Sequence, residues 1–276
     1  MKVIKTRTSI EEVTEFPETI YKYRKWEGHH KTILTDQIVF MASPSSFEDP
    51  LDCKLFKRYD LLTDKEIYEK YLLHSKQHNH GYTRQQHMVF ANGWAQNSPM
   101  KSAAHIDVAR KEHFRQFNNR FGVLSLTANP INVEMWGKYS DNHAGFCVGF
   151  HPKLMFKFMG GGGDVKYYET LPDIMPMDTF DDEHFKQVFS KEKKWEFEQE
   201  YRTHKFYEQH LATEEDRRIK LPTNCFKEVI FGHDMALDQR KEIIEVCRGQ
   251  RLPVNFFSAT LNLKYMTAKM EQILNP

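Results

Sequence analysis

Short apolar runs separated by turns predict strands in the first and last parts of the chain. Residues 19–24 (TIYKYR) combine aromatic and β-branched side chains, which favour strands. Residues 38–41 (IVFM) form a second apolar run that ends at the turn of Ser43 and Pro44. Further strands are predicted at 121–127, 145–150, 165–168, 198–206, 229–232 and 254–259, and the last of these is expected to end the series.

Between these strands lies a long block whose apolar positions recur at helical spacing. The stretches 64–72, 85–94 and 103–117 each predict a helix, and Asp64 is the expected cap of the first. Two more helices are predicted at 183–193 and 237–248. Because helices and strands do not alternate regularly, the pattern favours an α+β fold over a doubly wound sheet. We expect a single domain over 1–276, in which 62–120 form a helical insertion, a lid or a small subdomain.

The charge balance does not alter the predicted fold, but it bears on the class of function. The chain carries 39 Lys and Arg against 38 Asp and Glu, a formal net charge of +1. A protein that binds nucleic acid through bulk charge needs a basic face, so the balance argues against that class without excluding a local basic groove. Acidic residues gather at 173–183 and basic ones at 110–120 (Arg110, Lys111, Arg115, Arg120), the latter interpreted as a solvated helix face.

The composition is that of a globular protein with an unusual number of rings. Aromatic residues make up 13% of the chain, enough apolar area to build a core and to exclude a disordered tail. No apolar run approaches the length of a membrane helix, and the first 16 residues lack the apolar region of a secretory signal. The four cysteines show no CxxC spacing, so we expect reduced core thiols and a cytoplasmic protein.

The densest cluster of candidate chemistry is the segment 195–202 (WEFEQEYR). As a strand it would place Glu196, Glu198 and Glu200 on one face, with Arg202 beside them. One interpretation is a solvent-facing edge whose carboxylates pair with basic side chains. The other is a catalytic carboxylate whose pKa is shifted by a second acid.

A second cluster lies at 135–150 (MWGKYSDNHAGFCVGF). Trp136, Tyr139 and His143 recur within eight residues beside two strand glycines. They form either a helical turn packed on a strand or the aromatic wall and polar histidine of a small-molecule cleft. His74, His78 and His80 lack a further ligand nearby, so no metal site is predicted. The glycines at 160–163 lack the lysine of a phosphate-binding loop and predict a mobile hairpin loop.

Taken in order, these segments resemble a bacterial family of uncharacterised domains often found among mobile and phage-related genes. The motifs that carry the resemblance cover most of the chain outside the helical block. They are 21–24 (YKYR), 47–52 (FEDPLD), 125–127 (SLT), 135–150, 198–202 (EQEYR) and 229–232 (VIFG).

The same order also resembles that of the ADP-ribosyltransferases, which implies a mixed or antiparallel β core and NAD as substrate. By this resemblance, the NAD-holding residue of the first strand is Arg24, Tyr23 or Tyr21, and the mid-chain hydroxyl is Ser125 or Thr127. Glu200 is then the catalytic glutamate and Glu198 its paired acid. Trp136, Tyr139 and His143 complete the cofactor-binding set. The sequence Ser-Leu-Thr departs from the usual Ser-Thr-Ser, and the helical block is longer than the minimal fold.

The resemblance implies a glycosyltransferase that moves ADP-ribose to a macromolecule, either protein or nucleic acid including RNA. It also implies a toxin of antiviral defence. The sequence does not tell whether an antitoxin partner exists. An NAD glycohydrolase and a non-catalytic ligand- or partner-binding module are the alternatives. We expect Glu200 to be an exposed strand carboxylate, so that Glu200→Gln abolishes activity and leaves the melting temperature nearly unchanged.

Overall fold

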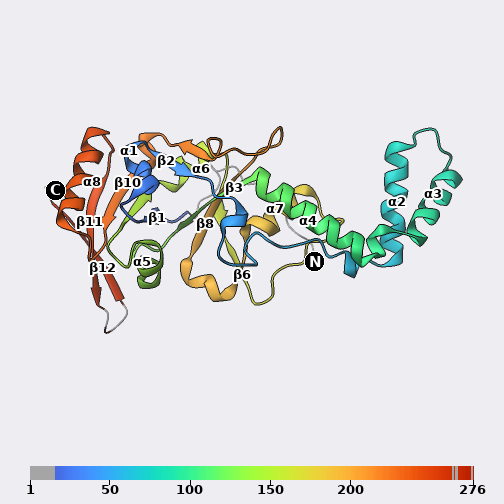
Figure 1. The fold of residues 1–276 in the computed structure, drawn as a ribbon, viewed down its shortest axis with the longest axis horizontal. Helices are drawn as coiled ribbons and strands as arrows, with labels where there is room; N and C mark the ends of the chain where they lie inside the picture. The colour runs from blue at the N-terminus through green and yellow to red at the C-terminus, as the bar shows by residue number, and fades with distance from the viewer. Residues whose placement is uncertain (1–15, 263, 265–266, 275) are drawn as a thin grey trace.

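A computed structural model describes residues 16–262, 264, 267–274 and 276, so most of the N-terminal segment assessed for a signal lies outside the described residues. The chain folds into a mixed α+β structure built on an eight-stranded sheet in the order β12-β11-β10-β4-β1-β3-β8-β5 (Figure 1). The strands of this sheet are β1 Ile20–Arg24, β3 Phe121–Thr127, β4 Phe146–Phe150, β5 Gly163–Asp164, β8 Glu200–Phe206, β10 Phe226–Phe231, β11 Asn255–Asn262 and β12 Thr267–Gln272.

Two small sheets lie beside the large one. They pair β2 Ile38–Phe40 with β9 Arg218–Lys220, and β6 Lys166–Tyr168 with β7 Ser190–Glu192. The helices are α1 Thr32–Thr35, α2 Asp64–His78, α3 Arg84–Gln96, α4 Ala103–Arg120, α5 Val133–Tyr139, α6 Pro152–Met159, α7 Phe180–Phe189 and α8 Leu237–Gly249. Among the residues that the structure describes, no helix has the length and apolar character needed to cross a bilayer.

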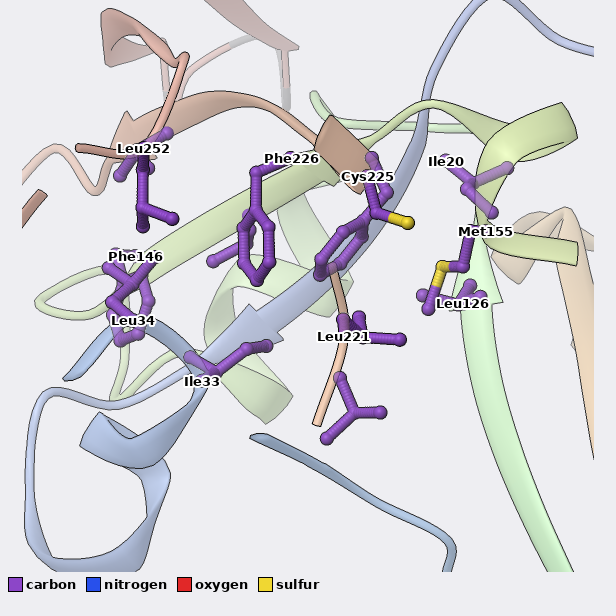
Figure 2. Close-up of a cluster of buried hydrophobic side chains, with 14 of the residues drawn as sticks. Ile20, Ile33, Leu34, Leu126, Phe146, Met155, Leu221, Cys225, Phe226 and Leu252 are labelled. Atoms are coloured by element: carbon purple, nitrogen blue, oxygen red, sulfur yellow. The ribbon is translucent and has the colours of Figure 1, made fainter. Parts of the chain in front are cut away.

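One face of the sheet carries the main core. Apolar side chains of α1, α6 and α8 pack there against the inward-facing residues of β1, β3, β4 and β10 (Figure 2). Phe146, Phe156 and Phe226 are fully buried in this core, and burying an aromatic side chain of this size stabilises the fold by about 1.5–3 kcal/mol. All four cysteines are free and buried, which confirms that they lie in the core.

The opposite face of the sheet is covered by the short helix α5. Trp136 of α5 meets the ring of Tyr23 edge-on at 4.9 Å between centroids, next to Tyr21, Cys147 and Ile230. The side chains of Glu200 and Arg202 lie on this same face. Residues directly opposite each other in paired strands share a face, and Tyr21 lies opposite Thr127, which in turn lies opposite Glu200. The α5 face is therefore the one that holds the candidate chemistry.

The helical block was predicted correctly, and it extends away from the sheet. Figure 1 shows α2 and α3 as a hairpin at the far end of α4. Thr63, rather than Asp64, caps α2: its hydroxyl accepts from the Glu66 backbone N–H, while the Glu66 carboxylate accepts from the Thr63 N–H. Thr83 and Gln86 form the same reciprocal cap on α3.

Three predicted boundaries are wrong for identifiable reasons. The strand series continues past 259, because β12 pairs with β11 as an antiparallel edge strand of polar composition. The segment before the glycines is a helix, α6, whose cap Gly160 takes a left-handed conformation (φ 89°), and Gly163 belongs to β5. The helix predicted at 183–193 ends at Phe189, and the chain continues as β7.

Candidate functional site

The weakest seam of the large sheet lies between β1 and β3. Only one residue pair, Tyr21 with Thr127, joins these strands, whereas five pairs join β1 to β4 and seven join β3 to β8. A cleft of about 280 Å³ opens at this seam, close to the lower end of the range for small-molecule sites. The Lys22 ammonium donates to the Ser125 carbonyl across the seam at 2.6 Å.

The two predicted acids, Glu198 and Glu200, lie together in this cleft, but not on a regular strand. Residues Lys193–Glu198 form a 3₁₀ helix, and Gln199 then takes a left-handed conformation (φ 42°) before β8 begins. This turn buries Glu198 and Glu200 on the cleft side and leaves Glu196 exposed outside it. The prediction that all three glutamates share one strand face is therefore wrong.

Two basic residues neutralise most of the charge of these acids. Lys191 contacts Glu198 directly and lies 3.0 Å from Glu200 and 3.7 Å from Asp52. Arg202 donates to both oxygens of Glu200 and to both oxygens of Asp52. The expected pairing of Arg202 with a glutamate is confirmed. Glu200 is only 5% exposed, so the expectation of an exposed carboxylate is wrong.

The network fixes the protonation states of its members. Burial would raise the pKa of Glu200, but the charges of Arg202 and Lys191 outweigh it and hold that pKa below its ordinary value. Burial would likewise lower the pKa of Lys191, yet Glu200, Glu198 and Asp52 hold it above its ordinary value. At neutral pH the cleft therefore contains an ionised Glu200 and a charged Lys191.

Three predicted residues support the acids directly. Tyr139 lines the cleft and donates to Glu198 Oε1 at 3.0 Å. Thr127 is buried and donates to the Glu198 carbonyl oxygen at 2.5 Å, so it positions the turn before β8 rather than lining the cleft. Ser125 lines the cleft from β3, and its side-chain hydrogen bond to Glu200 helps to lower the pKa of that carboxyl.

The first-strand residues divide between the two faces of β1. Tyr21 and Tyr23 are buried but line the cleft, and their hydroxyls donate to Glu228 Oε1 at 2.7 Å and to the Asn129 carbonyl at 2.8 Å. Arg24 is half-buried at the cleft and donates to the Tyr23 carbonyl at 3.1 Å. Burial lowers the pKa of Arg24 to about 10, so the guanidinium is charged at neutral pH.

Trp136 and His143 lie outside the cleft. Trp136 is 0% exposed and donates from Nε1 to the Pro130 carbonyl, so its ring is core material and cannot stack on a ligand. His143 follows α5 in a left-handed conformation (φ 71°), and its carbonyl accepts from the Asp234 N–H beyond β10. The predicted aromatic wall is thus reduced to Tyr139.

Trp195 is a further ring that lines the cleft. The ammonium groups of Lys138, Lys191 and Lys194 lie 4.8, 5.2 and 5.8 Å from its ring centre. Its buried Nε1 has no hydrogen-bond partner within the described part of the chain. The strand predicted for 195–202 would place Trp195 on the face opposite the glutamates, because side chains alternate along a strand, but Trp195 lies in a 3₁₀ helix.

Sequence reasoning also missed Lys191, Asp52 and Asp49. Lys191 gave no signal, since it fell inside a predicted helix. The two aspartates belong to the segment 47–52, which the motif comparison singled out without assigning a role. Asp49 is 8% exposed and lines the cleft; its Oδ1 accepts from the Leu51 N–H at 3.0 Å, while its buried Oδ2 has no partner among the described residues.

The arrangement offers a carboxylate, a guanidinium and an unpaired acceptor in one cleft. Within residues 16–262 and the described positions beyond, no three His, Cys, Asp or Glu side chains come together to hold a metal ion. No protein-family model, curated protein or solved structure matches the chain.

Proposed function

We propose that the chain is an ADP-ribosyltransferase that uses NAD as substrate and acts in this cleft on a macromolecular acceptor. The observation that carries the proposal is the pair of buried glutamates, Glu198 and Glu200, fixed at the open seam of a mixed sheet that also presents the charged Arg24. This is the combination that the sequence resemblance implies. The ADP-ribosyltransferase fold is part of the same proposal.

The ion-pair network at one wall of the cleft suits the reaction. Three carboxylates (Asp52, Glu198, Glu200) face two cations (Lys191, Arg202), which leaves one negative charge in the network. When the bond between nicotinamide and the ribose C1′ breaks, its electron pair leaves with nicotinamide and positive charge develops on the ribose. A fixed carboxylate in a partly dry cleft stabilises that charge without having to reorient.

Arg24 supplies the complementary function for the anionic part of NAD. Its guanidinium has one hydrogen bond, to the Tyr23 carbonyl, and no carboxylate partner within the described residues. A guanidinium with free N–H groups binds phosphate oxygens bidentately. The acceptor nucleophile then forms the new bond to C1′ and releases its proton to water, and with water as nucleophile the same site hydrolyses NAD.

One observation favours a second candidate, a binding module without turnover. All four oxygens of Glu198 and Glu200 already accept a hydrogen bond or an ion pair from Tyr139, Lys191 or Arg202. A purely structural charge network would show the same saturation. Such a module would bind NAD or a related ligand and release it unchanged.

The proposal is tested by incubating the protein with NAD labelled in the adenylate part, alone and with cell lysate. Label on protein or nucleic acid supports transfer, and free nicotinamide without bound label indicates hydrolysis. Binding of NAD with neither product indicates the module. Glu200→Gln should remove the label, whereas Glu196→Gln, which alters an exposed glutamate of the same turn outside the cleft, should not. Equal labelling by both variants would contradict the assignment of Glu200.

A further inference from the structure

The helical hairpin of α2 and α3, here called the arm (Asp64–Gln96), stands apart from the body of the protein (Figure 1). Both of its helices are capped reciprocally, so they are well defined at their N-termini. The seam between them is thin: the buried side chains are Ile67 and Ser75 on α2, and Ala91 and Ala95 on α3. Apart from Ile67, its larger apolar side chains are partly buried or exposed.

Five rings form a row along one face of the arm. Tyr71 stacks with Trp94 at 5.9 Å between centroids, Trp94 meets Phe90 at 6.2 Å, and His74 stacks with Phe90 at 6.4 Å. His74 in turn lies 4.4 Å from His78, close to the end of α2. Trp94 is 50% exposed, so the row is open to solvent rather than closed into a core.

The acidic residues of the arm, Asp64, Glu66 and Glu69, all lie in the first two turns of α2. Residues 70–106 contain no Asp or Glu, although 38 acidic residues in 276 would place about five in a stretch of this length. The same stretch holds four Lys and Arg and five His. Lys70 and Lys101 are occupied by the Pro176 carbonyl and by Asp64.

Two exposed cations, Lys76 and Arg84, remain at the tip of the arm. They lie near the end of α2 and at the start of α3, next to the exposed Tyr82, and the described residues offer neither an ion-pair partner nor a hydrogen bond to their side chains. The basic residues of α4 differ. Lys111 pairs with Asp107 at 2.7 Å and Arg115 with Glu112 at 2.7 Å, so the predicted solvated face of α4 is internally neutralised.

We propose that the arm binds single-stranded nucleic acid, with phosphates at Lys76 and Arg84 and bases stacked on the ring row. Exposed rings along the arm and unpaired cations at its tip are the elements from which proteins build platforms for unpaired strands. On α2, Lys76 is two positions from both His74 and His78 and so lies off the ring row, which means that the strand turns around the tip to reach both kinds of contact. A duplex keeps its base faces covered and would leave the rings unused. The exposed aliphatic residues Leu73 and Val89 are offset from Tyr71 and Phe90 by two positions and one position, so they lie off the ring row.

Binding of the strand does not depend on the chemistry of the cleft. The bound strand would also be the acceptor of ADP-ribose, and this part of the inference rests on the proposed function. The two statements are separated by measuring binding without NAD.

The test measures fluorescence anisotropy of a labelled 20-nucleotide RNA, of the DNA strand with the same sequence, and of the corresponding duplex, with the full chain. We expect the single strands to bind more tightly than the duplex. Trp94→Ala should weaken binding at least about fivefold, as expected for the loss of one stacked base. Lys76→Glu with Arg84→Glu should weaken it further at low salt and reduce the slope of log affinity against log salt by about 1.4, since two phosphate contacts are lost.

The matched control is Lys111→Glu with Arg115→Glu, which makes the same charge change on α4, where both cations already have partners. It should change the affinity less than twofold.

Circular dichroism establishes that the helices persist, and the tip variant alters only exposed side chains. The absence of binding at low salt, tighter binding of the duplex, or equal loss in the control would overturn the proposal. Displacement by poly-glutamate with no effect of Trp94→Ala would indicate an acidic protein partner instead.

Two further outcomes separate this inference from the proposed function. If the strand binds the arm and no label is transferred from NAD under any condition, the proposed function fails and the arm remains a nucleic-acid site. If label reaches nucleic acid equally well with the tip variant and the wild type, the cleft is active and the arm does not deliver the acceptor.

Discussion

At the scale of single residues, the stability of the site depends on how its buried ionised side chains neutralise one another. Arg202 is fully buried and remains charged because Glu200 and Asp52 surround it. Removing one member of such a network leaves its partners uncompensated, which costs far more than the loss of a surface ion pair. Every substitution here therefore acts on stability as well as on activity.

Glu200→Gln should abolish turnover and also destabilise the fold. Arg202 keeps its two bonds to Asp52, so we expect the loss of unfolding free energy near the lower end of the about 3–5 kcal/mol typical of a broken buried pair. Thermal and denaturant unfolding measure it. Thr203→Val is the control: it removes a buried hydrogen bond to the Gly161 carbonyl on the other face of β8 and should destabilise while retaining activity. An unchanged melting temperature for Glu200→Gln would contradict the network.

Asp49→Asn tests whether the unpaired Oδ2 serves a ligand. The substitution keeps an oxygen that can accept from the Leu51 N–H and replaces the buried Oδ2, which has no partner among the described residues, so stability should hold or rise, because an unpaired buried carboxylate oxygen is costly. If that oxygen accepts a hydrogen bond from NAD, affinity should fall about tenfold or more, which calorimetric titration measures. Glu196→Gln, on an exposed glutamate outside the cleft, is the control. An affinity unchanged by Asp49→Asn would assign Asp49 to the loop alone, through its bond to the Leu51 N–H.

At the scale of elements, the seam between β1 and β3 depends on how closely the neighbouring strands approach. Gly145 precedes β4, and a Cβ there would meet the carbonyl oxygen of Arg24 and the hydroxyl of Ser140. The end of β1 that carries Arg24 is thus held against a position that only glycine fits. This links the backbone at Gly145 to the placement of a candidate ligand residue.

Gly145→Ala should destabilise the protein by at least about 1–3 kcal/mol, the usual cost of overpacking, because backbone atoms on two sides cannot move away. It should also weaken NAD binding if Arg24 shifts with the end of β1. Gly163→Ala in β5 is the matched control, since its Cβ would meet nothing within 4 Å and its backbone is not left-handed. Equal melting temperatures for the two variants would refute this close approach.

Helices and strands were predicted correctly where the hydrophobic pattern stayed periodic over a long stretch of the chain. Residues 121–127 form β3 as predicted, and the helices of the block appear within a few residues of their expected ends. The failures occur where local conformation breaks a pattern. Gln199 takes a left-handed conformation that ends the 3₁₀ helix before β8, and no spacing rule indicates this for a glutamine.

At the scale of the whole molecule, the cleft collects residues from segments far apart in the chain. Glu198, Glu200, Ser125, Tyr139 and Arg24 were predicted and do line it together. Lys191 and Asp49 were not, because their placement depends on tertiary packing of a loop and of β7 that leaves no periodic trace. Trp136 was assigned to the cleft but lies in the core. Whether an aromatic side chain of α5 points into the core or into the cleft depends on which face of β1 the helix covers, and the sequence does not show this.

Acid should loosen the junction where α4, which leads to the arm, meets α7 and β8. Burial lowers the pKa of His184 on α7 to about 4, helped by the nearby His204, His113 and Lys57 and opposed by Asp181. The His184 ring lies among those of Phe121, Phe180 and Phe206. Burial also lowers the pKa of His204 and of His113, the latter against the opposing charge of Glu183.

The sign of the pH dependence follows from these shifts. As pH falls below about 6.5, the unfolded chain takes up protons at these histidines while the folded protein does not, until about pH 4 for His184. The free energy of unfolding should therefore decrease between pH 6.5 and 4. His184→Phe, which keeps a ring in the aromatic cluster, should reduce the drop in melting temperature over this range by a few degrees. His80→Gln, at the exposed tip of the arm, should not. A drop of the same size in wild type and His184→Phe would show that this junction does not govern the acid response.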